Sequence, residues 1–553
     1  MSIDRGMRLL GIRQFTYQRN STSLDDRSVI TGGEQILKRC IGDTQAKFEG
    51  KDLCVISNFV PHTIGDNVEQ IVRECTVLDN EVLSRHPYVG CLSKQGAIEY
   101  FPILSPGLLW SYASCYFRQR EGTLMAIAYA CRCEEITDLI DDDLNAMSAV
   151  SGEKYHDYLN VAVDIAKKII KRITDYTPYD EGKHFLNFDS RFSESENKIS
   201  MIMKQIQKLS IRIMENNVEQ IIEKAAMNPQ ECYLSVSGGF ALNCPTNTHL
   251  LKHYGFKGFI APPCVNDSGI SPGIALYSFH KLYPGFRFRL EHAYYGDNCD
   301  NLEQVTGGTF GKYVKSISGF EPETAVEDIC HEPVVWFDSR AEIGPWALGN
   351  RSMLADPRSE NAKAQLNKIK QRQWWRPVAP IVLNEYAADW FPDAIHSPFM
   401  LLTFIIENGK TKDIPAVAHL DKTARVQSVL YNAKNEYLHQ ILTHFHQRTG
   451  VPMLCNTSLN DRGEPIINSI AEALNFALRK NIKVIYINGK RIELHAHEEY
   501  PEKAPLKRSD KFRMSIPENV KKSLIEKYNP ENLQPDEIKR FLALADAMPF
   551  DYE

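Results

Sequence analysis

The residues best suited to chemistry are cationic side chains in the second half of the chain. The segment DSRAEIGPWALGNRSMLADPR presents Arg340, Asn350 and Arg351, and IKQRQWW then places Lys370 and Arg372 two residues apart. In an extended segment two such side chains point to the same side. Guanidinium groups bind phosphate oxygens in pairs and lysine adds a compact positive charge, so the pattern predicts a pocket for a phosphorylated substrate. The competing interpretation is a set of solvated surface charges.

A second group of polar side chains follows a short apolar strand. In VPMLCNTSLNDR the apolar residues give way to Asn456, Ser458, Asn460 and Arg462. Side chains at a strand end can converge on a polar molecule outside the sheet. The same residue types also form ordinary turns, so a turn without a ligand stays the alternative.

Two further segments carry candidate binding residues. AHLDKTARVQSV adds Arg425 to the predicted phosphate pocket. LSVSGGFALN places Ser237, Gly238 and Gly239 at a strand end that opens a helix near Asn243. Small residues there allow the backbone to approach a nucleotide phosphate or ribose, although a tight strand-to-helix turn needs the same residues.

Alternating strand-like and helical segments indicate an α/β protein. Apolar residues recur at helical spacing over 155–173 and 199–226, whereas DLCVISNF and ECYLSVSGG have the character of strands. We expect a first α/β domain over 1–330, a second over 331–500 and a helical tail over 501–553.

Composition narrows the class of protein and of partner. The 553 residues carry a formal net charge of -6, which gives no electrostatic basis for binding nucleic acid or an anionic membrane. The start lacks the apolar core of a signal peptide, and no stretch has the length of a membrane-spanning helix. The 13 cysteines are scattered without paired CxxC spacing, which suits a reducing compartment. We therefore expect a cytoplasmic protein with small-molecule partners, and a homodimer stays open.

Several segments, taken in order, resemble the O-carbamoyltransferases that modify nodulation factors and antibiotics. They are LSVSGGFALNCPTN, PPCVNDSG, GPWALGNRSMLADPR, IKQRQWWRPVAP and THFHQRTGVPMLCNTSLNDRGEPI, and the resemblance covers most of residues 90–480. It implies an ASKHA (actin-like ATPase) N-terminal domain fused to a YrdC-like C-terminal domain. The YrdC-like domain would form carbamoyl-adenylate from carbamoyl phosphate and ATP with Mg²⁺. The ASKHA-like domain would transfer the carbamoyl group to a hydroxyl of a small molecule, as in natural product biosynthesis.

The resemblance also assigns residues. YrdC-like sites carry a K-x-R pair and an S-x-N pair, which match Lys370 with Arg372 and Ser458 with Asn460, so these four are the expected catalytic residues. In PWALGNR the family usually has arginine where this chain has Trp346, so one cationic contact is missing. The expected substrate- and nucleotide-binding residues are Arg340, Asn350, Arg351, Arg425, Asn456, Arg462, Ser237, Gly238, Gly239 and Asn243.

The N-terminal region departs from the family in its metal motif. An H-x-x-x-H pair is usual there, whereas SNFVPHTIGD has an asparagine four residues before His62. Asp267 in VNDSG matches the metal-binding aspartate of the family, and Asp79 is a candidate for another ligand. The resemblance therefore implies a weakened or oxygen-rich site at these three residues for a divalent ion such as Fe, Zn or Mn. His249 and His253 have i, i+4 spacing but stand elsewhere in the chain, and we expect them to be surface residues of a helix.

Three functions remain open on the sequence. The first is carbamoyl transfer from carbamoyl-adenylate to a small-molecule hydroxyl. The second keeps the activating chemistry but directs the acyl-adenylate to an amine or another acceptor, because the acceptor domain has been remodelled. The third is a non-catalytic nucleotide-binding paralogue, which the retained K-x-R and S-x-N pairs disfavour. Motifs do not name the acceptor, because acceptor specificity depends on pocket shape.

Overall fold

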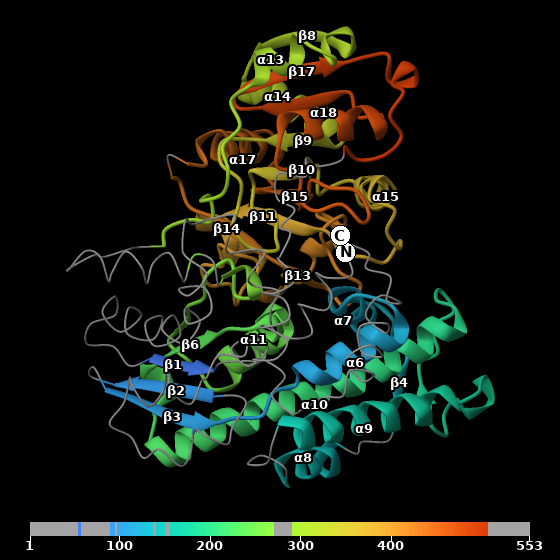
Figure 1. Cartoon of the computed structure of the whole chain (residues 1–553), viewed down its shortest axis with the longest axis vertical. Helices are drawn as coiled ribbons and strands as arrows, with labels where there is room; N and C mark the ends of the chain where they lie inside the picture. Colours follow the sequence, from blue (N-terminus) through green and yellow to red (C-terminus); the bar gives the residue numbers. More distant parts are fainter. Residues whose placement is uncertain are drawn as a thin grey trace, which may run out of the picture.

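The protein folds into two sheet-centred halves that share one hydrophobic core cluster. The computed structural model describes residues 53–56, 89–94, 97–136, 140–149, 155–269, 272, 290–432 and 434–506. The N-terminal half, drawn in blue and green, lies below the yellow-to-red C-terminal half in Figure 1. The expected α/β class is confirmed. Within the described ranges, no helix combines the length and apolar character needed to cross a membrane.

A five-stranded mixed sheet forms the centre of the N-terminal half. Its strands are β1 (Leu53–Ile56), β2 (Val89–Lys94), β3 (Ala97–Pro102), β6 (Tyr233–Val236) and β7 (Gly258–Phe259). They lie in the order β3-β2-β1-β6-β7. The β1–β2 and β2–β3 pairs are antiparallel, whereas β1–β6 and β6–β7 are parallel. The short strands β4 (Glu134–Glu135) and β5 (Phe185–Leu186) pair separately.

Helices pack beside this sheet around one long central helix. They are α6 (Gly107–Phe117), α7 (Glu121–Ala130), α8 (Ile140–Ala149), α9 (Tyr155–Thr174), α10 (Glu194–Ala225) and α11 (Cys244–His253). The 32-residue α10 contacts α7, α8, α9 and α11. It begins at a capping box in which Ser193 and Glu196 satisfy each other's backbone N–H groups, so it starts earlier than the apolar pattern indicates. Helices α9 and α10 confirm the two helices that apolar spacing predicts over 155–173 and 199–226.

An eight-stranded sheet forms the C-terminal half, in the order β14-β11-β15-β10-β9-β16-β17-β8. Its strands are β8 (Val314–Gly319), β9 (Val334–Phe337), β10 (Arg351–Ala355), β11 (Ala379–Leu383), β14 (Gln427–Val429), β15 (Met453–Ser458), β16 (Val484–Ile487) and β17 (Lys490–Leu494). Because β8 pairs antiparallel with β17, the sheet includes chain that precedes the expected boundary between residues 330 and 331. The expected helical tail lies, from residue 507 onward, outside the described residues.

Helices and a small hairpin complete this half. The helices are α13 (Leu302–Thr306), α14 (Pro322–His331), α15 (Glu360–Ile369), α16 (Ala387–Trp390), α17 (Glu436–Thr449) and α18 (Ile470–Arg479), and β12 (Thr403–Ile405) pairs with β13 (Thr423–Arg425). The apolar run before the polar residues of VPMLCNTSLNDR is strand β15, as expected, and it lies between β10 and β11. Its polar end therefore emerges from the middle of the sheet.

The segment after the K-x-R pair joins the two halves. The Arg376 guanidinium, which is 8% exposed, donates a hydrogen bond from Nη1 to Oγ1 of Thr123 on α7. The neighbouring Trp375 donates from Nε1 to Oε1 of Glu196 on α10 at 3.2 Å. The predicted activating residues are thus only a few positions along the chain from the contact between the halves.

Candidate functional site

The centre of the candidate site is the ammonium group of Lys370. Its Nζ donates to the Ser458 carbonyl oxygen at 2.6 Å, to Ser458 Oγ at 2.9 Å and to the Asn460 carbonyl oxygen at 3.2 Å. It also bonds Oδ1 of Asn460. Lys370 is 3% exposed. The fold therefore brings together three of the four expected catalytic residues, although Lys370 precedes Ser458 by 88 residues in the sequence.

The K-x-R pair is held by a helix end, not by an extended segment. Lys370 is the C-cap of α15, and Gln371 has a φ of 52° in the left-handed region. The Arg372 N–H donates to the Asn367 carbonyl at 2.8 Å, which closes a turn of the Schellman type. The backbone here is a helix end, so the rule that two side chains in an extended segment point the same way does not apply to Lys370 and Arg372. The half-buried Arg372 side chain still lies near β15, with Nη1 3.4 Å from Oγ1 of Thr457.

A network of charges supports the loop that carries Asn460. Asn460 Nδ2 donates to the Glu464 carbonyl at 2.7 Å. At the end of α18, Arg479 and Lys480 contact the Asp461 carboxylate at 2.6 and 2.7 Å. Burial would raise the pKa of Asp461, but its hydrogen bonds with these two cations keep it below the ordinary value. The sequence analysis did not predict these ion pairs. Two adjacent cations at the C-terminal end of a predicted helix are the pattern that could have indicated them.

The loop before β10 is organised by one carboxylate. Oε1 of Glu342 accepts hydrogen bonds from the backbone N–H groups of Leu348, Asn350 and Arg351 at 2.7, 2.8 and 3.1 Å. The Asn350 side chain donates from Nδ2 to the Arg340 carbonyl at 2.8 Å. The predicted binding residue Asn350 is thus part of the hydrogen bonding that shapes this loop.

The side chain of Arg351 is enclosed by the protein. It is 0% exposed, and its terminal nitrogens donate to the carbonyls of Asp338 at 2.8 Å and Ser339 at 3.0 Å. Its guanidinium carbon lies 3.7 Å from the centre of the Phe337 ring. Burial lowers the pKa of Arg351. These contacts give the guanidinium a structural role, and phosphate binding by Arg351 stays a prediction that this geometry does not favour.

Arg425 packs against Trp346, which stands where the resemblance leads us to expect an arginine. Its guanidinium carbon lies 3.9 Å from the centre of the Trp346 ring, a separation at which the ring face attracts a cation. Trp346 packs against a small apolar cluster that includes Leu348. The chain therefore has an aromatic support where a second cation is expected. The other expected phosphate ligands, Arg340 and Arg462, are exposed.

Asn456 is buried within the sheet, and its side-chain oxygen could accept a hydrogen bond from a ligand. It is 2% exposed, and Nδ2 donates to the Ala347 carbonyl at 3.1 Å and to Oε1 of Gln427 at 2.9 Å. Gln427 in turn donates to the Leu348 carbonyl at 2.6 Å. Oδ1 of Asn456 is buried and meets no donor in the described part of the chain. A buried acceptor left this way costs free energy, so it is a suitable place for a ligand donor.

The SGG loop lies beside the VNDSG loop in the N-terminal half. Gly238 has a φ of 92°, and its N–H donates to the Val265 carbonyl at 2.8 Å. Ser237 is half-buried and Gly239 exposed. Asp267 starts the 3₁₀ turn Asp267–Gly269 and is exposed. The structure thus brings the two motifs together at one edge of the sheet.

Asn243 caps helix α11. Its Oδ1 accepts from the Thr246 N–H at 3.2 Å, and its Nδ2 donates to Oε1 of Gln207 on α10 at 2.8 Å. The expected metal ligands His62 and Asp79 lie outside the described residues, so the structure places Asp267 alone of that set and the site stays a prediction.

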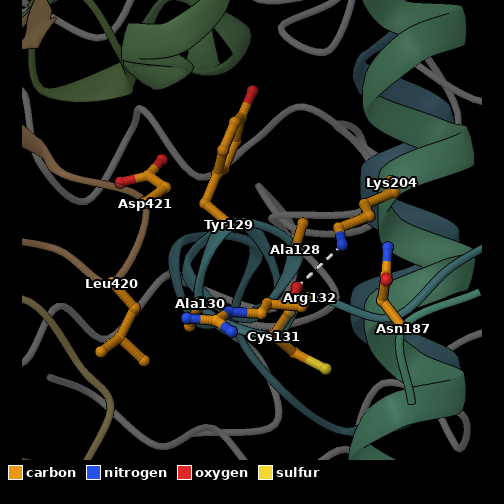
Figure 2. Close-up of a pocket in the computed structure, with 9 residues that line it drawn as sticks. All are labelled: Ala128, Tyr129, Ala130, Cys131, Arg132, Asn187, Lys204, Leu420 and Asp421. Carbon is orange, nitrogen blue, oxygen red and sulfur yellow. Dashed lines mark hydrogen bonds between the residues drawn. The ribbon is translucent and has the colours of Figure 1, made fainter. Parts of the chain in front are cut away.

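A cleft of about 480 Å³ lies where the two halves meet (Figure 2). It is lined by Ala128, Tyr129, Ala130, Cys131, Arg132, Asn187, Lys204, Leu420 and Asp421. The wall is shaped by Lys204 of α10, whose Nζ donates to the Cys131 and Cys133 carbonyls at 2.8 and 2.7 Å. Burial lowers the pKa of Lys204. The sequence analysis did not find this cleft, because its walls come from segments far apart in the chain.

The polar side of the cleft holds a phenol and a carboxylate. Burial, together with the charge of Asp421, raises the pKa of the Tyr129 hydroxyl, which therefore stays protonated. Oδ1 of Asp421 lies 2.9 Å from Nδ1 of the buried His419 and accepts from Thr423 Oγ1 at 2.7 Å. Burial opposes ionisation, but the His419 and Thr423 hydrogen bonds keep the pKa of Asp421 below its ordinary value. The cleft thus offers a hydroxyl and a negative charge.

Comparison with known proteins identifies relatives of this chain. Residues 327–493 match the family model for the carbamoyltransferase C-terminus. Nodulation protein NolNO of Sinorhizobium fredii is 36% identical over 265 residues, covering 46% of this chain and 39% of the relative. Nodulation protein NolO of Bradyrhizobium diazoefficiens is 34% identical over 259 residues, covering 45% and 47%. The 3'-hydroxymethylcephem-O-carbamoyltransferase of Amycolatopsis lactamdurans is 28% identical over 333 residues, covering 58% of each.

The family-model match includes the candidate site around Lys370. Lys370, Arg372, Ser458 and Asn460 all fall inside the matched residues 327–493. The chain spans about half the length of the curated relatives that it matches. Residues 327–493 are therefore similar to the C-terminal domain of carbamoyltransferases, and one of the relatives carries the name of an O-carbamoyltransferase.

Proposed function

We propose that this protein is an ATP-dependent carbamoyltransferase that acts on a hydroxyl group of a small molecule in secondary metabolism. In the first step carbamoyl phosphate, water and ATP give carbamoyl-adenylate, phosphate and pyrophosphate. In the second step the acceptor oxygen attacks the carbamoyl carbon, its proton is released and AMP leaves. The name of the Amycolatopsis relative specifies O-carbamoylation of a 3'-hydroxymethylcephem, which supports oxygen as the acceptor atom.

The observation that carries this proposal is the buried Lys370 ammonium within the family-matched domain. It meets Ser458 and Asn460 at the open end of β15, with Arg372 beside them. A fixed positive charge of this kind stabilises the negative charge that develops on a transferring phosphoryl group. Of the four oxygens around Nζ, the Asn460 carbonyl at 3.2 Å is the most distant one measured, and a substrate oxygen would replace it first.

The other expected ligands fit a nucleotide and a carbamoyl group around this centre. Oδ1 of Asn456 would accept from the carbamoyl amide, since its buried position favours a ligand donor. Arg425, held over Trp346, would contact a phosphate. Gly238 would let the backbone approach ribose or phosphate in the N-terminal half, because it has no side chain and adopts the positive φ that favours glycine. Mg²⁺ would accompany the nucleotide and balance its charge.

The cleft between the halves is the proposed acceptor site. Arg376 contacts α7 at Thr123, and Tyr129, six residues further along the same helix, lines the cleft. At 1.5 Å per residue these points are roughly 9 Å apart along the helix axis. The apolar Leu420 and the polar Asp421 suit a small hydroxylated molecule. The acceptor would therefore lie close to the site where the adenylate forms.

The decisive experiment measures the two steps separately. Purified protein given ATP, Mg²⁺ and carbamoyl phosphate without an acceptor should release pyrophosphate, and omission of carbamoyl phosphate should stop the release. Hydroxyl and amine acceptors are then compared by mass spectrometry for the gain of one carbamoyl group. Carbamoylation of amines alone would replace oxygen by nitrogen as the acceptor atom. Absence of pyrophosphate from folded protein would refute the proposed activity.

A further inference from the structure

A cluster of two imidazoles and a carboxylate lies where α10 and α11 pack together. Nε2 of His249 is 2.7 Å from Oε1 of Glu215, and the His249 and His253 rings lie 5.2 Å apart at 16°. One ligand atom from each of the three residues lies within 4.8 Å of the others. The two histidines are one helical turn apart, so their spacing is fixed by α11. In the described part of the chain, no other group of three histidine, cysteine or carboxylate side chains converges in this way.

We propose that Glu215, His249 and His253 bind a divalent transition metal ion, with Zn²⁺ the expected occupant. Imidazole nitrogens and a carboxylate oxygen are ordinary Zn²⁺ ligands, and three protein ligands leave a fourth position for water or another small ligand. Glu215 and His249 are half-buried and His253 is exposed. The ion would therefore enter from solvent while two of its ligands are already held by packing.

The charges around the cluster orient the carboxylate for this role. Arg212 Nη1 lies 3.4 Å from Oε2 of Glu215 and 3.3 Å from Oε1 of Glu219. It thus holds the carboxylate oxygen that does not face His249, which leaves Oε1 for the ion. Arg212 also repels a cation, but the two glutamates together carry more charge than the one arginine. Tyr254 connects the same elements by donating to the Glu215 carbonyl at 3.2 Å.

A metal here would stabilise the helix that connects the two halves. The Asn247 side chain on α11 donates to the Leu401 carbonyl at 3.0 Å, and Thr248 Oγ1 accepts from the Thr403 N–H at 2.9 Å. The same helix is capped by Asn243 directly after the SGG loop. Tying α11 to α10 would therefore hold both the loop and the contact with the C-terminal half. This inference concerns residues other than the expected His62, Asp79 and Asp267, and it does not depend on the proposed function.

The test measures metal binding by the whole chain. Protein is stripped with a chelator, the chelator is removed, and Zn²⁺ is titrated by calorimetry while thermal unfolding is followed with and without excess Zn²⁺. The parent should bind Zn²⁺ and gain a few degrees in its unfolding midpoint, since a ligand that binds the native state stabilises it. His253→Ala and Glu215→Gln should each lose one equivalent of binding, or at least about tenfold in affinity for it, because each removes one of three ligands.

Matched controls separate this site from others in the chain. His331→Ala removes an exposed histidine at the end of α14 and should leave the binding isotherm unchanged. His253 is exposed, so its variant should fold like the parent, and circular dichroism checks this. Co²⁺ provides a second measurement, because its visible absorption bands should change in the His253 variant and not in the His331 variant. Absence of Zn²⁺ binding by the parent, or identical isotherms for the parent and both cluster variants, would overturn the proposal.

Discussion

Replacing Lys370 by methionine tests the centre of the proposed site. Methionine fills nearly the same space as the lysine stem, so Lys370→Met removes the ammonium from four oxygens without opening a cavity. Contacts to a charged donor contribute about 1.5–3 kcal/mol each. Two of those measured here are 2.6 and 2.9 Å long, but desolvation of the charge offsets part of their gain. We therefore expect the free energy of unfolding to fall by about 1–3 kcal/mol.

The loss of activity should be larger than the loss of stability. Removal of one fixed charge or donor at a developing anion typically reduces the rate by about 10²–10³-fold. The assay is pyrophosphate release with ATP, Mg²⁺ and carbamoyl phosphate, and urea unfolding of the same samples measures stability. Lys368→Met is the matched control, because Lys368 is exposed on the last turn of the same helix. A folded Lys370→Met protein that releases pyrophosphate at close to the parent rate would refute the assigned role.

Three more predictions follow from the same geometry. Trp346→Ala removes the ring beneath a guanidinium and should raise the KM for carbamoyl phosphate or ATP several-fold, whereas Trp346→Phe should keep most of the contact; steady-state kinetics measures both. Gly344→Ala places a Cβ against the Pro263 carbonyl oxygen at a φ of +107°, and it should destabilise the protein by more than about 1 kcal/mol. Gly409 has a φ of +88° and open space around it, so Gly409→Ala measures the backbone cost alone in the same thermal unfolding assay. Burial raises the pKa of Asp338 to about 6, so the protonated carboxyl stabilises the folded protein at low pH, and this contribution is lost as the pH rises through 6. The free energy of unfolding of the parent should therefore fall by about 1 kcal/mol from this group between pH 5.5 and 7.5. Asp338→Asn should abolish that fall, and urea unfolding at the two pH values measures it.

The convergence of Lys370 with Ser458 and Asn460 could be predicted because each part of it has a local signal. An apolar run that changes to amides and hydroxyls marks where β15 leaves the sheet, and the family motif links that position to the lysine. Nothing local specifies that Ser458 is still paired in the strand while Asn460 lies beyond it. That detail depends on the antiparallel pairing of Ser458 with Ser352 of β10.

The course of the backbone at Lys370 could not be predicted from the sequence. Gln371 occupies the left-handed region, which costs a residue with a side chain about 1–2 kcal/mol and normally favours glycine. Contacts of the two neighbouring residues select this conformation. Lys370 is hydrogen-bonded to β15, and the Arg372 N–H closes the helix end by donating to the Asn367 carbonyl. Spacing alone relates the two side chains only if the segment is extended, and it does not reveal this turn.

The sequence also does not show whether an arginine binds a ligand or stabilises the fold. A guanidinium binds phosphate oxygens and main-chain carbonyls through the same donors, so residue type alone does not reveal which it binds. Arg351 donates to the carbonyls of Asp338 and Ser339, whereas Arg425 lies over an aromatic ring. The extent of the C-terminal sheet depends on the pairing of β8 with β17, which is also non-local. Such features become visible only when the neighbours are known.

On the proposed mechanism, the Lys370 site and the cleft between the halves would carry out two chemical steps in one chain. Carbamoyl-adenylate is an activated compound, and exclusion of water protects it from hydrolysis before transfer. The chain segment that continues from Lys370 contacts α7 through Arg376 and α10 through Trp375, so helical structure connects the proposed activating pocket with the cleft lined by Tyr129. A fixed separation would favour direct passage of the carbamoyl group to a bound acceptor, because effective concentration falls with every degree of freedom between the two sites.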